Sequence, residues 1–230
     1  LKIRMIPVEK VFKKFPRIVR NLARDLGKEV DLTVLGEETE LDRSVVDEIG
    51  DPLIHLIRNA MDHGLETPDE RVAAGKPRKG TLILSAAHEG NQIVISIKDD
   101  GRGVDTDKVA RKAKEKGLVT DEQLAAMGQR ELLDLIFLPG FSTKEKATDL
   151  SGRGVGMDVV RTNIKKLNGI IDIRSELGRG SEFILKLPLT LAIIQSLLVE
   201  VEDETYSLPL AAVLETLRVD EKEFHTIGGQ

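Results

Sequence analysis

Three polar side chains recur at four-residue intervals in the segment HLIRNAMDHG, residues 55–64. On a helix, His55, Asn59 and His63 fall within about 80° of arc on one face. Arg58 and Asp62 flank that face, and five ionic or amide groups so close together favour a binding or catalytic site over a merely solvated surface. A zinc site is not indicated, because the sequence contains no HExxH motif and no cysteine.

A carboxylate followed by two glycines marks the second candidate site, KDDGRGV at residues 98–104. Asp99 lies where a predicted strand ends, and Gly101 and Gly103 let the backbone turn sharply and approach a ligand closely. An isolated DxGxG is equally compatible with an ordinary turn at the end of a strand. Its meaning therefore depends on the motifs that accompany it.

A run of alternating glycines leads into a helix in the third candidate site, SGRGVGMDVV at residues 151–160. The backbone amides at such a helix start form a ready binding site for phosphate, although a flexible loop before an ordinary helix has the same composition. The GxGxG spacing of Gly152, Gly154 and Gly156 matches neither the P-loop nor the GxGxxG dinucleotide fingerprint. We therefore exclude P-loop and Rossmann sites.

Hydrophobic periodicity predicts the helices that must hold these motifs in place. Apolar residues at three- and four-residue intervals predict a helix over 8–26, which Pro16 kinks or splits. A second helical region covers 42–64, with a restart at Asp51-Pro52, because Asp caps helices and Pro suits their first turn. The other predicted helices cover residues 105–117, 121–137 and 154–169.

Alternating apolar residues predict the strands. A short strand is expected at 30–34, a hairpin within 81–101 and a second hairpin over 170–189, with a loop rich in Gly, Ser and Thr at 138–153. This order of elements predicts an α+β fold, in which a mostly antiparallel sheet carries its helices on one face.

Composition excludes several classes of protein. The 230 residues have a net charge of −5 and only 3% aromatic side chains, which argues against nucleic acid as a partner. The most apolar stretch, LTLAIIQSLLVEV, is too short for a membrane span, and the lack of cysteine fits a cytoplasmic protein. Because Leu1 is not an initiator Met, we expect the chain to be a fragment of a longer protein.

The order of these motifs resembles the GHKL superfamily, which groups histidine kinases with gyrase-type, MutL-type and heat-shock ATPases. Over nearly the whole chain, the sequence is similar to the kinase domain of CheA-type chemotaxis histidine kinases. The segments that carry this similarity are HLIRNAMDHG, DDGRGV, PGFSTKEK, SGRGVGMDVV and LPLTLAIIQSLLV. The resemblance implies a Bergerat-type two-layer α/β sandwich that binds ATP and Mg²⁺.

The resemblance also implies roles for single residues. Asp99 would accept a hydrogen bond from the adenine amino group, with Gly101 and Gly103 giving the base room. Asn59 would ligate Mg²⁺, with His63 beside it. The residues facing the triphosphate would be His63, Arg58, Lys108 and Lys112, although an ordinary solvated helix face explains the two lysines equally well. Residues 138–153 would form an ATP lid, and the contacts implied there and at the following helix start are Ser142, Lys144, Gly152, Gly154, Val155, Gly156 and Met157.

His55 distinguishes a kinase from a hydrolytic relative. The hydrolytic GHKL members carry a water-activating Glu at this position, whereas a histidine acceptor already presents a neutral ring nitrogen and needs no such base. The catalytic residues are therefore predicted to be His55, Arg58, Asn59 and His63, in a protein histidine kinase. The alternatives are a GHKL ATPase that works as a conformational machine and a non-catalytic docking scaffold.

The resemblance divides the chain into a kinase domain, residues 1–188, and the incomplete start of a CheW-like regulatory β domain, residues 189–230. It implies that the phosphate acceptor is a histidine on a separate domain, and we expect the isolated chain not to label itself. The parent protein is expected to be a homodimer that binds a CheW-like adaptor and chemoreceptors, without insertion into the membrane.

Overall fold

The computed structural model describes residues 5–141, 156–189, 196–201, 204–209 and 213. The chain forms two compact units, Leu1–Leu191 and Ala192–Gln230. This division lies close to the predicted domain boundary, while the identity of the second unit stays a prediction. Among the described residues, no helix has the length and apolar character needed to cross a membrane.

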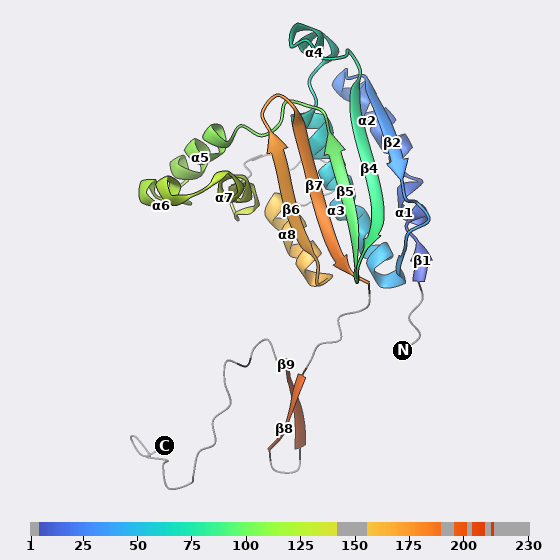
Figure 1. The fold of residues 1–230 in the computed structure, drawn as a ribbon, viewed down its shortest axis with the longest axis vertical. Coiled ribbons are helices and arrows are strands. Elements are labelled where there is room, and N and C mark those ends of the chain that lie inside the picture. Colours follow the sequence, from blue (N-terminus) through green and yellow to red (C-terminus); the bar gives the residue numbers. More distant parts are fainter. Residues whose placement is uncertain (1–4, 142–155, 190–195, 202–203, 210–212, 214–230) are drawn as a thin grey trace. The chain divides into compact units, whose positions relative to one another are not determined.

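A five-stranded sheet forms the centre of the first unit, with the strand order β2-β4-β5-β7-β6 (Figure 1). β2 pairs in parallel with β4, and all other neighbours are antiparallel. The mixed, mostly antiparallel sheet and both predicted hairpins are confirmed. The strand bounds are β2 Val30–Leu35, β4 Gly80–Glu89, β5 Gln92–Asp99, β6 Ile170–Glu176 and β7 Gly180–Pro188.

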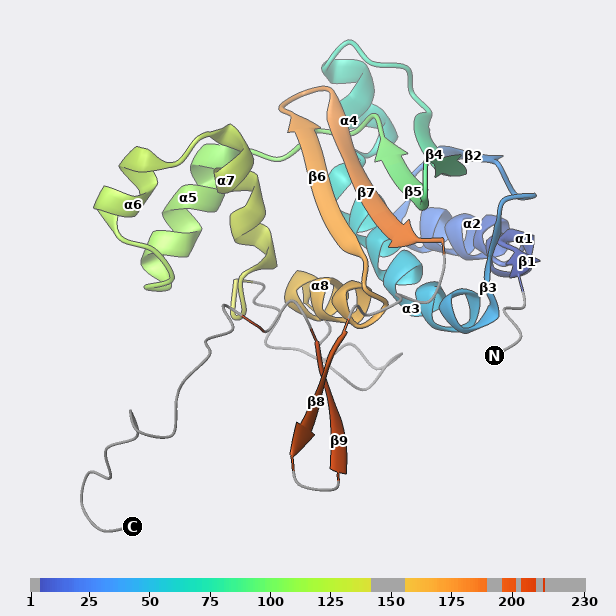
Figure 2. The ribbon, with the colours of Figure 1, turned by 60° about the horizontal axis from the view of Figure 1, so that its bottom comes forward.

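Helices α2 (Phe15–Leu26), α3 (Arg43–Asn59) and α8 (Met157–Lys166) lie against one face of this sheet (Figure 2). Their apolar side chains meet every second residue of the strands, because side chains alternate between the two faces of a strand. The core between the layers includes the fully buried residues Leu53, Leu56, Ile57, Ile93, Ile95 and Ile97.

The first predicted helix is split, as Pro16 suggested. Helix α1 covers Glu9–Phe12, and Pro16 then lies in the first turn of α2, where its missing N–H has no helical partner to lose. A small antiparallel sheet pairs β1 (Met5–Pro7) with β3 (Glu40–Asp42). The sequence did not predict this pair, because each strand has three residues.

The predicted restart at Asp51-Pro52 is wrong. Helix α3 is continuous from its N-cap, Asp42, whose side chain accepts a hydrogen bond from the Ser44 amide at 2.8 Å. Pro52 lies inside the helix and is buried together with its neighbour Leu53. Packing of this apolar stripe therefore offsets the backbone hydrogen bond that Pro52 removes.

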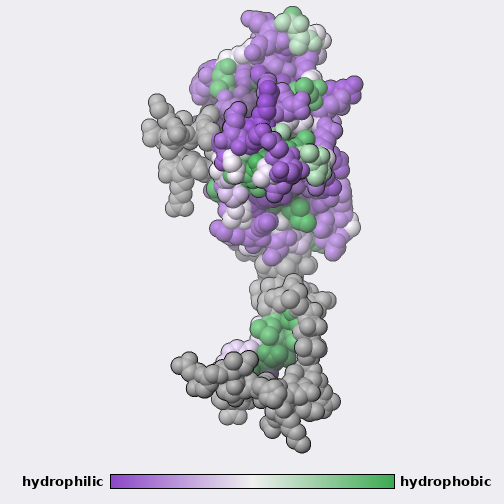
Figure 3. Space-filling view, turned by 90° about the vertical axis from the view of Figure 1, so that its left-hand side faces the viewer, coloured by the Kyte–Doolittle hydropathy of each residue, from purple (hydrophilic) through white to green (hydrophobic). Residues whose placement is uncertain are grey.

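The predicted helix at 121–137 is three pieces. Helix α6 covers Asp121–Ala126, α7 covers Gln129–Asp134, and a 3₁₀ turn, η2, covers Leu135–Phe137. The break occurs because Gly128 is an extended N-cap, whose amide donates to the Glu131 carboxylate at 2.7 Å. Helix α5 covers Thr106–Glu115, close to prediction. On the side with these helices, hydrophilic side chains dominate the surface (Figure 3).

The described part of the second unit is one antiparallel hairpin, β8 (Ser196–Val201) with β9 (Glu204–Pro209). The alternating apolar and polar residues of VEVEDETYSLPL, residues 199–210, predict such a hairpin. The segment LAAVLETL, residues 210–217, predicts a short helix, and it lies outside the described residues apart from Val213.

Candidate functional site

Two segments that carry predicted site residues meet through their backbones. Helix α3 continues into a π-helical turn, η1 (Ala60–Gly64), whose last carbonyl, that of Gly64, accepts a hydrogen bond from the Arg102 amide at 2.9 Å. A Cβ on Gly101 would lie 2.2 Å from the Gly64 carbonyl oxygen. The first two motifs are almost 40 residues apart in the sequence, yet they form one site. Only glycine fits at position 101 of this site, because any side chain there would clash with the Gly64 carbonyl.

Asp99 is the buried acceptor of this site. It ends β5, pairs with Ser181 of β7 and is only 3% exposed. Its carboxylate accepts a hydrogen bond from the Gly101 amide at 2.9 Å, and a Cβ on Gly64 would lie 3.2 Å from it. Burial raises the pKa of the Asp99 carboxyl to about 6, against the opposing effect of the backbone hydrogen bonds. A buried carboxylate with glycines beside it is suited to recognising a planar group with an N–H donor.

Gly103 makes a second close approach. Its φ of 70° lies in the left-handed region, and an added Cβ would lie 2.2 Å from the Glu176 carbonyl oxygen. The strand-end turn thus packs against the end of β6, as well as against η1. Close backbone contacts therefore require both glycines of DxGxG, while their close approach to a ligand stays a prediction.

Asn59 joins α3 to the third motif. Its side-chain nitrogen lies 3.0 Å from the sulfur of Met157, the first residue of α8, and Gly156 is the extended N-cap of that helix. This contact uses the amide nitrogen, so the amide oxygen is the atom that can serve a cation. The structure brings Asn59, Gly156 and Met157 together. The other predicted lid residues, Ser142, Lys144, Gly152, Gly154 and Val155, lie outside the described residues.

His55 lies half-buried on α3, one turn before Asn59. Burial lowers the pKa of the imidazole, Arg58 lowers it further, and Asp158 opposes both effects. Burial and Arg58 therefore favour the neutral form of the ring. This state fits the predicted role of His55 in transfer to another histidine.

His63 is exposed, and its Nε2 atom lies 3.5 Å from a carboxylate oxygen of Asp62. Within the described residues, no group of three or more His, Cys, Asp or Glu side chains could hold a metal. The amide oxygen of Asn59 fits Mg²⁺, which typically takes one or two protein ligands together with substrate phosphates. Imidazole suits transition metals better, so phosphate oxygens are the more natural partners of His63.

The two predicted lysines of α5 differ in their surroundings. Lys108 is 74% exposed and pairs with Asp105 at 3.4 Å. The Lys112 ammonium lies 5.2 Å from the centre of the Phe141 ring. Lys116, which was not predicted, donates to the carbonyls of Gly140 and Phe141, both at 2.8 Å. Lys112 and Lys116 thus bind the first part of the predicted lid, and their i, i+4 spacing was the available sequence signal.

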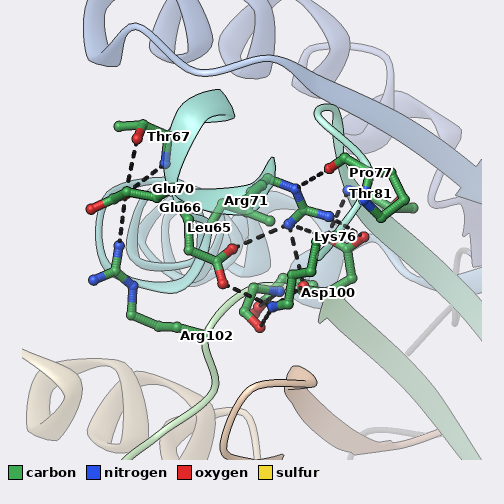
Figure 4. Close-up of polar contacts among 12 residues, drawn as sticks. Leu65, Glu66, Thr67, Glu70, Arg71, Lys76, Pro77, Thr81, Asp100 and Arg102 are labelled. Atoms are coloured by element: carbon green, nitrogen blue, oxygen red, sulfur yellow. Dashed lines mark hydrogen bonds and ion pairs between the residues drawn. The ribbon is translucent and has the colours of Figure 1, made fainter. Parts of the chain in front are cut away.

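Several charged residues surround the contact between η1 and the strand-end turn. The sequence did not predict them. Helix α4 (Pro68–Ala73) carries Arg71, which is 1% exposed and binds both Glu66 and Asp100 (Figure 4). Lys28 and Lys76 donate to backbone carbonyls of the two segments. Apart from Glu66, the partners named here are 24 or more residues away in sequence, so no local pattern identifies these contacts.

Known proteins resemble this chain in sequence and in fold. A family model described as histidine kinase-, DNA gyrase B- and HSP90-like ATPase matches residues 48–191. The catalytic domain of histidine kinase ThkA is 18% identical with a TM-score of 0.51, over 83% of this chain and 97% of that domain. This likeness shows the fold, and together with the family model it confirms the predicted two-layer GHKL architecture.

Two similar sequences are much closer in identity. The sensor histidine kinase CheAY of Helicobacter pylori is 56% identical over 230 residues, which are 100% of this chain and 29% of that protein. The chemotaxis protein CheA of Bacillus subtilis is 47% identical over 223 residues, which are 97% of this chain and 33% of that protein. The chain therefore spans no more than a third of the length of these two relatives.

Proposed function

The chain belongs to the family of histidine kinase-, DNA gyrase B- and HSP90-like ATPases, and from this membership we propose that it is the ATP-binding catalytic part of a chemotaxis histidine kinase. It transfers the γ-phosphoryl group of ATP to a histidine on a separate acceptor domain. The observation that carries this proposal is the buried Asp99 carboxylate, which lies beside the Gly64–Gly101 contact. That contact follows the end of the helix that bears His55 and Asn59.

Each side chain has a defined part in the transfer. Asp99 accepts a hydrogen bond from the adenine amino group and so orients the nucleotide. Asn59 holds Mg²⁺, which when bound neutralises charge on the phosphates. Arg58 and His63 face the triphosphate, Lys108 and Lys112 add positive charge, and the lid residues named from the sequence close over it.

The transfer itself replaces one bond to phosphorus with another. A ring nitrogen of the acceptor histidine forms a P–N bond as the bond from phosphorus to the β–γ bridging oxygen breaks and ADP leaves. The other ring nitrogen of the acceptor then carries a proton that is easily lost. His55, one turn before Asn59 on α3, is the side chain proposed to receive that proton.

Similarity to the chemotaxis protein CheA of Bacillus subtilis supports the proposed partners. We propose that the parent protein is a cytoplasmic homodimer that supplies the acceptor domain in trans and binds a CheW-like adaptor and chemoreceptors. Residues 189–230 would be the start of the adaptor-binding domain.

Transfer of labelled phosphate to a supplied histidine-bearing acceptor domain tests the proposed function. We expect wild-type chain to label the acceptor and not itself, and Asn59→Ala to slow labelling about tenfold or more, because the metal loses a ligand. Absence of transfer by the wild type, or equal transfer by Asn59→Ala, would contradict the proposal. Rapid phosphate release without acceptor would favour the ATPase machine, and absence of Mg-ATP binding would favour the docking scaffold.

His55→Gln separates transfer from binding. Gln is uncharged and similar in size but cannot accept a proton, so we expect slower transfer with ATP affinity changed only a few-fold. Single-turnover labelling and calorimetry measure the two quantities. His88→Gln, at an exposed position on β4, is the matched control. Weakened binding with normal transfer per bound ATP would rule out this role for His55.

A further inference from the structure

Lys28 and Lys76 each donate three hydrogen bonds to oxygens around the Gly64–Gly101 contact. An ammonium group has three donors, so each lysine is fully engaged. Neither residue belongs to the three motifs, and neither carries a role in the proposed transfer. Both nevertheless bind the backbone from which the site residues project.

Lys28 binds the η1 side of the contact. It follows the left-handed Gly27 that ends α2, and it donates to the carbonyls of Met61 at 2.6 Å, Asp62 at 2.8 Å and Leu65 at 2.8 Å. The last carbonyls of a helix have no partner within the helix, and here one ammonium supplies the donors. Burial lowers the pKa of Lys28. The residues it holds surround His63 and Gly64.

Lys76 binds the strand-end side of the contact. It donates to the carbonyls of Asp100 at 3.0 Å and Gly101 at 2.6 Å, and to the Glu66 carboxylate at 2.8 Å. Figure 4 shows it beside Arg71, whose guanidinium binds the Asp100 carboxylate at 3.1 and 2.9 Å. This network therefore fixes the two residues that directly follow Asp99.

The two lysines hold opposite sides of the same backbone contact. The Arg102 amide donates to the Gly64 carbonyl, and Gly101 packs directly on that carbonyl. If either side shifted, the distance between the Asp99 carboxylate and η1 would change. A displacement of about 1 Å in a site can cost about 100-fold in rate.

We propose that Lys28 and Lys76 are positioning residues of the nucleotide site, which act through the backbone carbonyls of residues 61, 62, 65, 100 and 101 to fix the Asp99 carboxylate relative to Asn59 and His63. This inference rests on the proposed function, because it assigns the positioned groups to ATP. The positioning itself exists without nucleotide.

Lys28→Met and Lys76→Met test this inference with two readouts. Met keeps much of the side-chain volume and removes the ammonium. In the nucleotide-free chain, we expect hydrogen exchange of the Arg102 amide to become about tenfold faster or more, with the amides of β5 unchanged. In calorimetry, we expect ATP affinity to fall about 10- to 100-fold, as when other residues that orient a site are lost. Lys79→Met, an exposed neighbour paired with Asp31, should change neither.

Two further variants separate positioning from loss of stability. Ile171→Ala removes a buried side chain of β6 and should lower the melting temperature without changing ATP affinity. Lys28→Arg keeps the charge, but its planar fork cannot aim three donors at three converging carbonyls, so we expect ATP affinity to stay below that of the wild type.

The outcomes are distinguishable. Two results would overturn the inference. The first is an unchanged hydrogen-exchange rate of the Arg102 amide in both Met variants. The second is a loss of ATP affinity in the Met variants that is no larger than the loss in Ile171→Ala, compared at an equal melting temperature. Failure of the wild type to bind ATP would instead overturn the proposed function, and the exchange measurement would still decide whether the lysines position the segments.

Discussion

Asp99→Asn is expected to weaken ATP binding at least about 100-fold while leaving the chain folded. The variant replaces one acceptor oxygen by an N–H₂ group, so a charge-assisted hydrogen bond to the adenine amino group is lost and two donors face each other. The oxygen that remains can still accept the hydrogen bond from the Gly101 amide. Calorimetry with Mg-ATP measures the loss, and the melting temperature reports the fold.

A change of nucleotide preference would identify Asp99 as the group that reads the base. Inosine triphosphate carries an oxygen where adenine has its amino group, so the side-chain amide introduced by Asp99→Asn can donate to it. We therefore expect the variant to bind inosine triphosphate better than ATP, the reverse of the wild type. Asp107→Asn, at an exposed position in α5, should keep the wild-type preference. Equal loss of both nucleotides would contradict the assignment.

The pH profile of the same pair of proteins checks the carboxylate. Burial raises the folded-state pKa of Asp99 to about 6 from 3.8, so protonation favours the folded state. That stabilisation is fully present below pH 3.8 and is lost as the pH rises through about 6. ATP affinity should have the opposite dependence and fall as the pH drops below about 6, because the ionised form is the better acceptor. Asp99→Asn should lack both dependences.

Short-range patterns predicted most of the fold. The two hairpins of the central sheet were predicted because both strands and the turn of each hairpin lie within about 20 residues. Strict alternation of apolar residues marks the strands, and glycine marks the turns. The error at Pro52 arose because local propensity disfavours proline inside a helix, whereas the buried packing of Leu53 and Leu56 decides the outcome. The missed break at Gly128 is the converse case, in which one capping interaction outweighs periodicity.

The candidate site was predictable only where chemistry and spacing coincide. His55, Asn59 and Asp99 were identified because polar groups recur on one helix face or precede paired glycines. Lys28 and Lys76 were not, because they bind carbonyls 33 and 24 residues or more away, and any residue type supplies a carbonyl. Sequence patterns therefore identify residues that are expected to contact a ligand more readily than residues that position the backbone of the site.

Gly101→Ala is expected to reduce ATP binding more than about 100-fold and to destabilise the fold by about 1 to 3 kcal/mol, the range for overpacked sites. Gly101 does not have a positive φ, so contact alone excludes a side chain there. The new Cβ would lie 2.2 Å from the Gly64 carbonyl oxygen and 2.8 Å from the Asp99 carboxylate. Neither atom belongs to a flexible chain end, so the two segments must separate.

Gly128→Ala provides the matched control for this change. Gly128 also has a negative φ, of −80°, and the nearest atom to its added Cβ would be the Glu131 carboxylate oxygen at 3.7 Å, an ordinary contact. We expect this control to keep both ATP affinity and melting temperature near the wild type. If Gly101→Ala bound ATP as the control does, then the Gly64–Gly101 contact would not set the geometry of the nucleotide site. A loss confined to Gly101→Ala would instead show that the close backbone approach, which joins the Asn-bearing helix to the strand-end carboxylate, is what makes the two motifs one site.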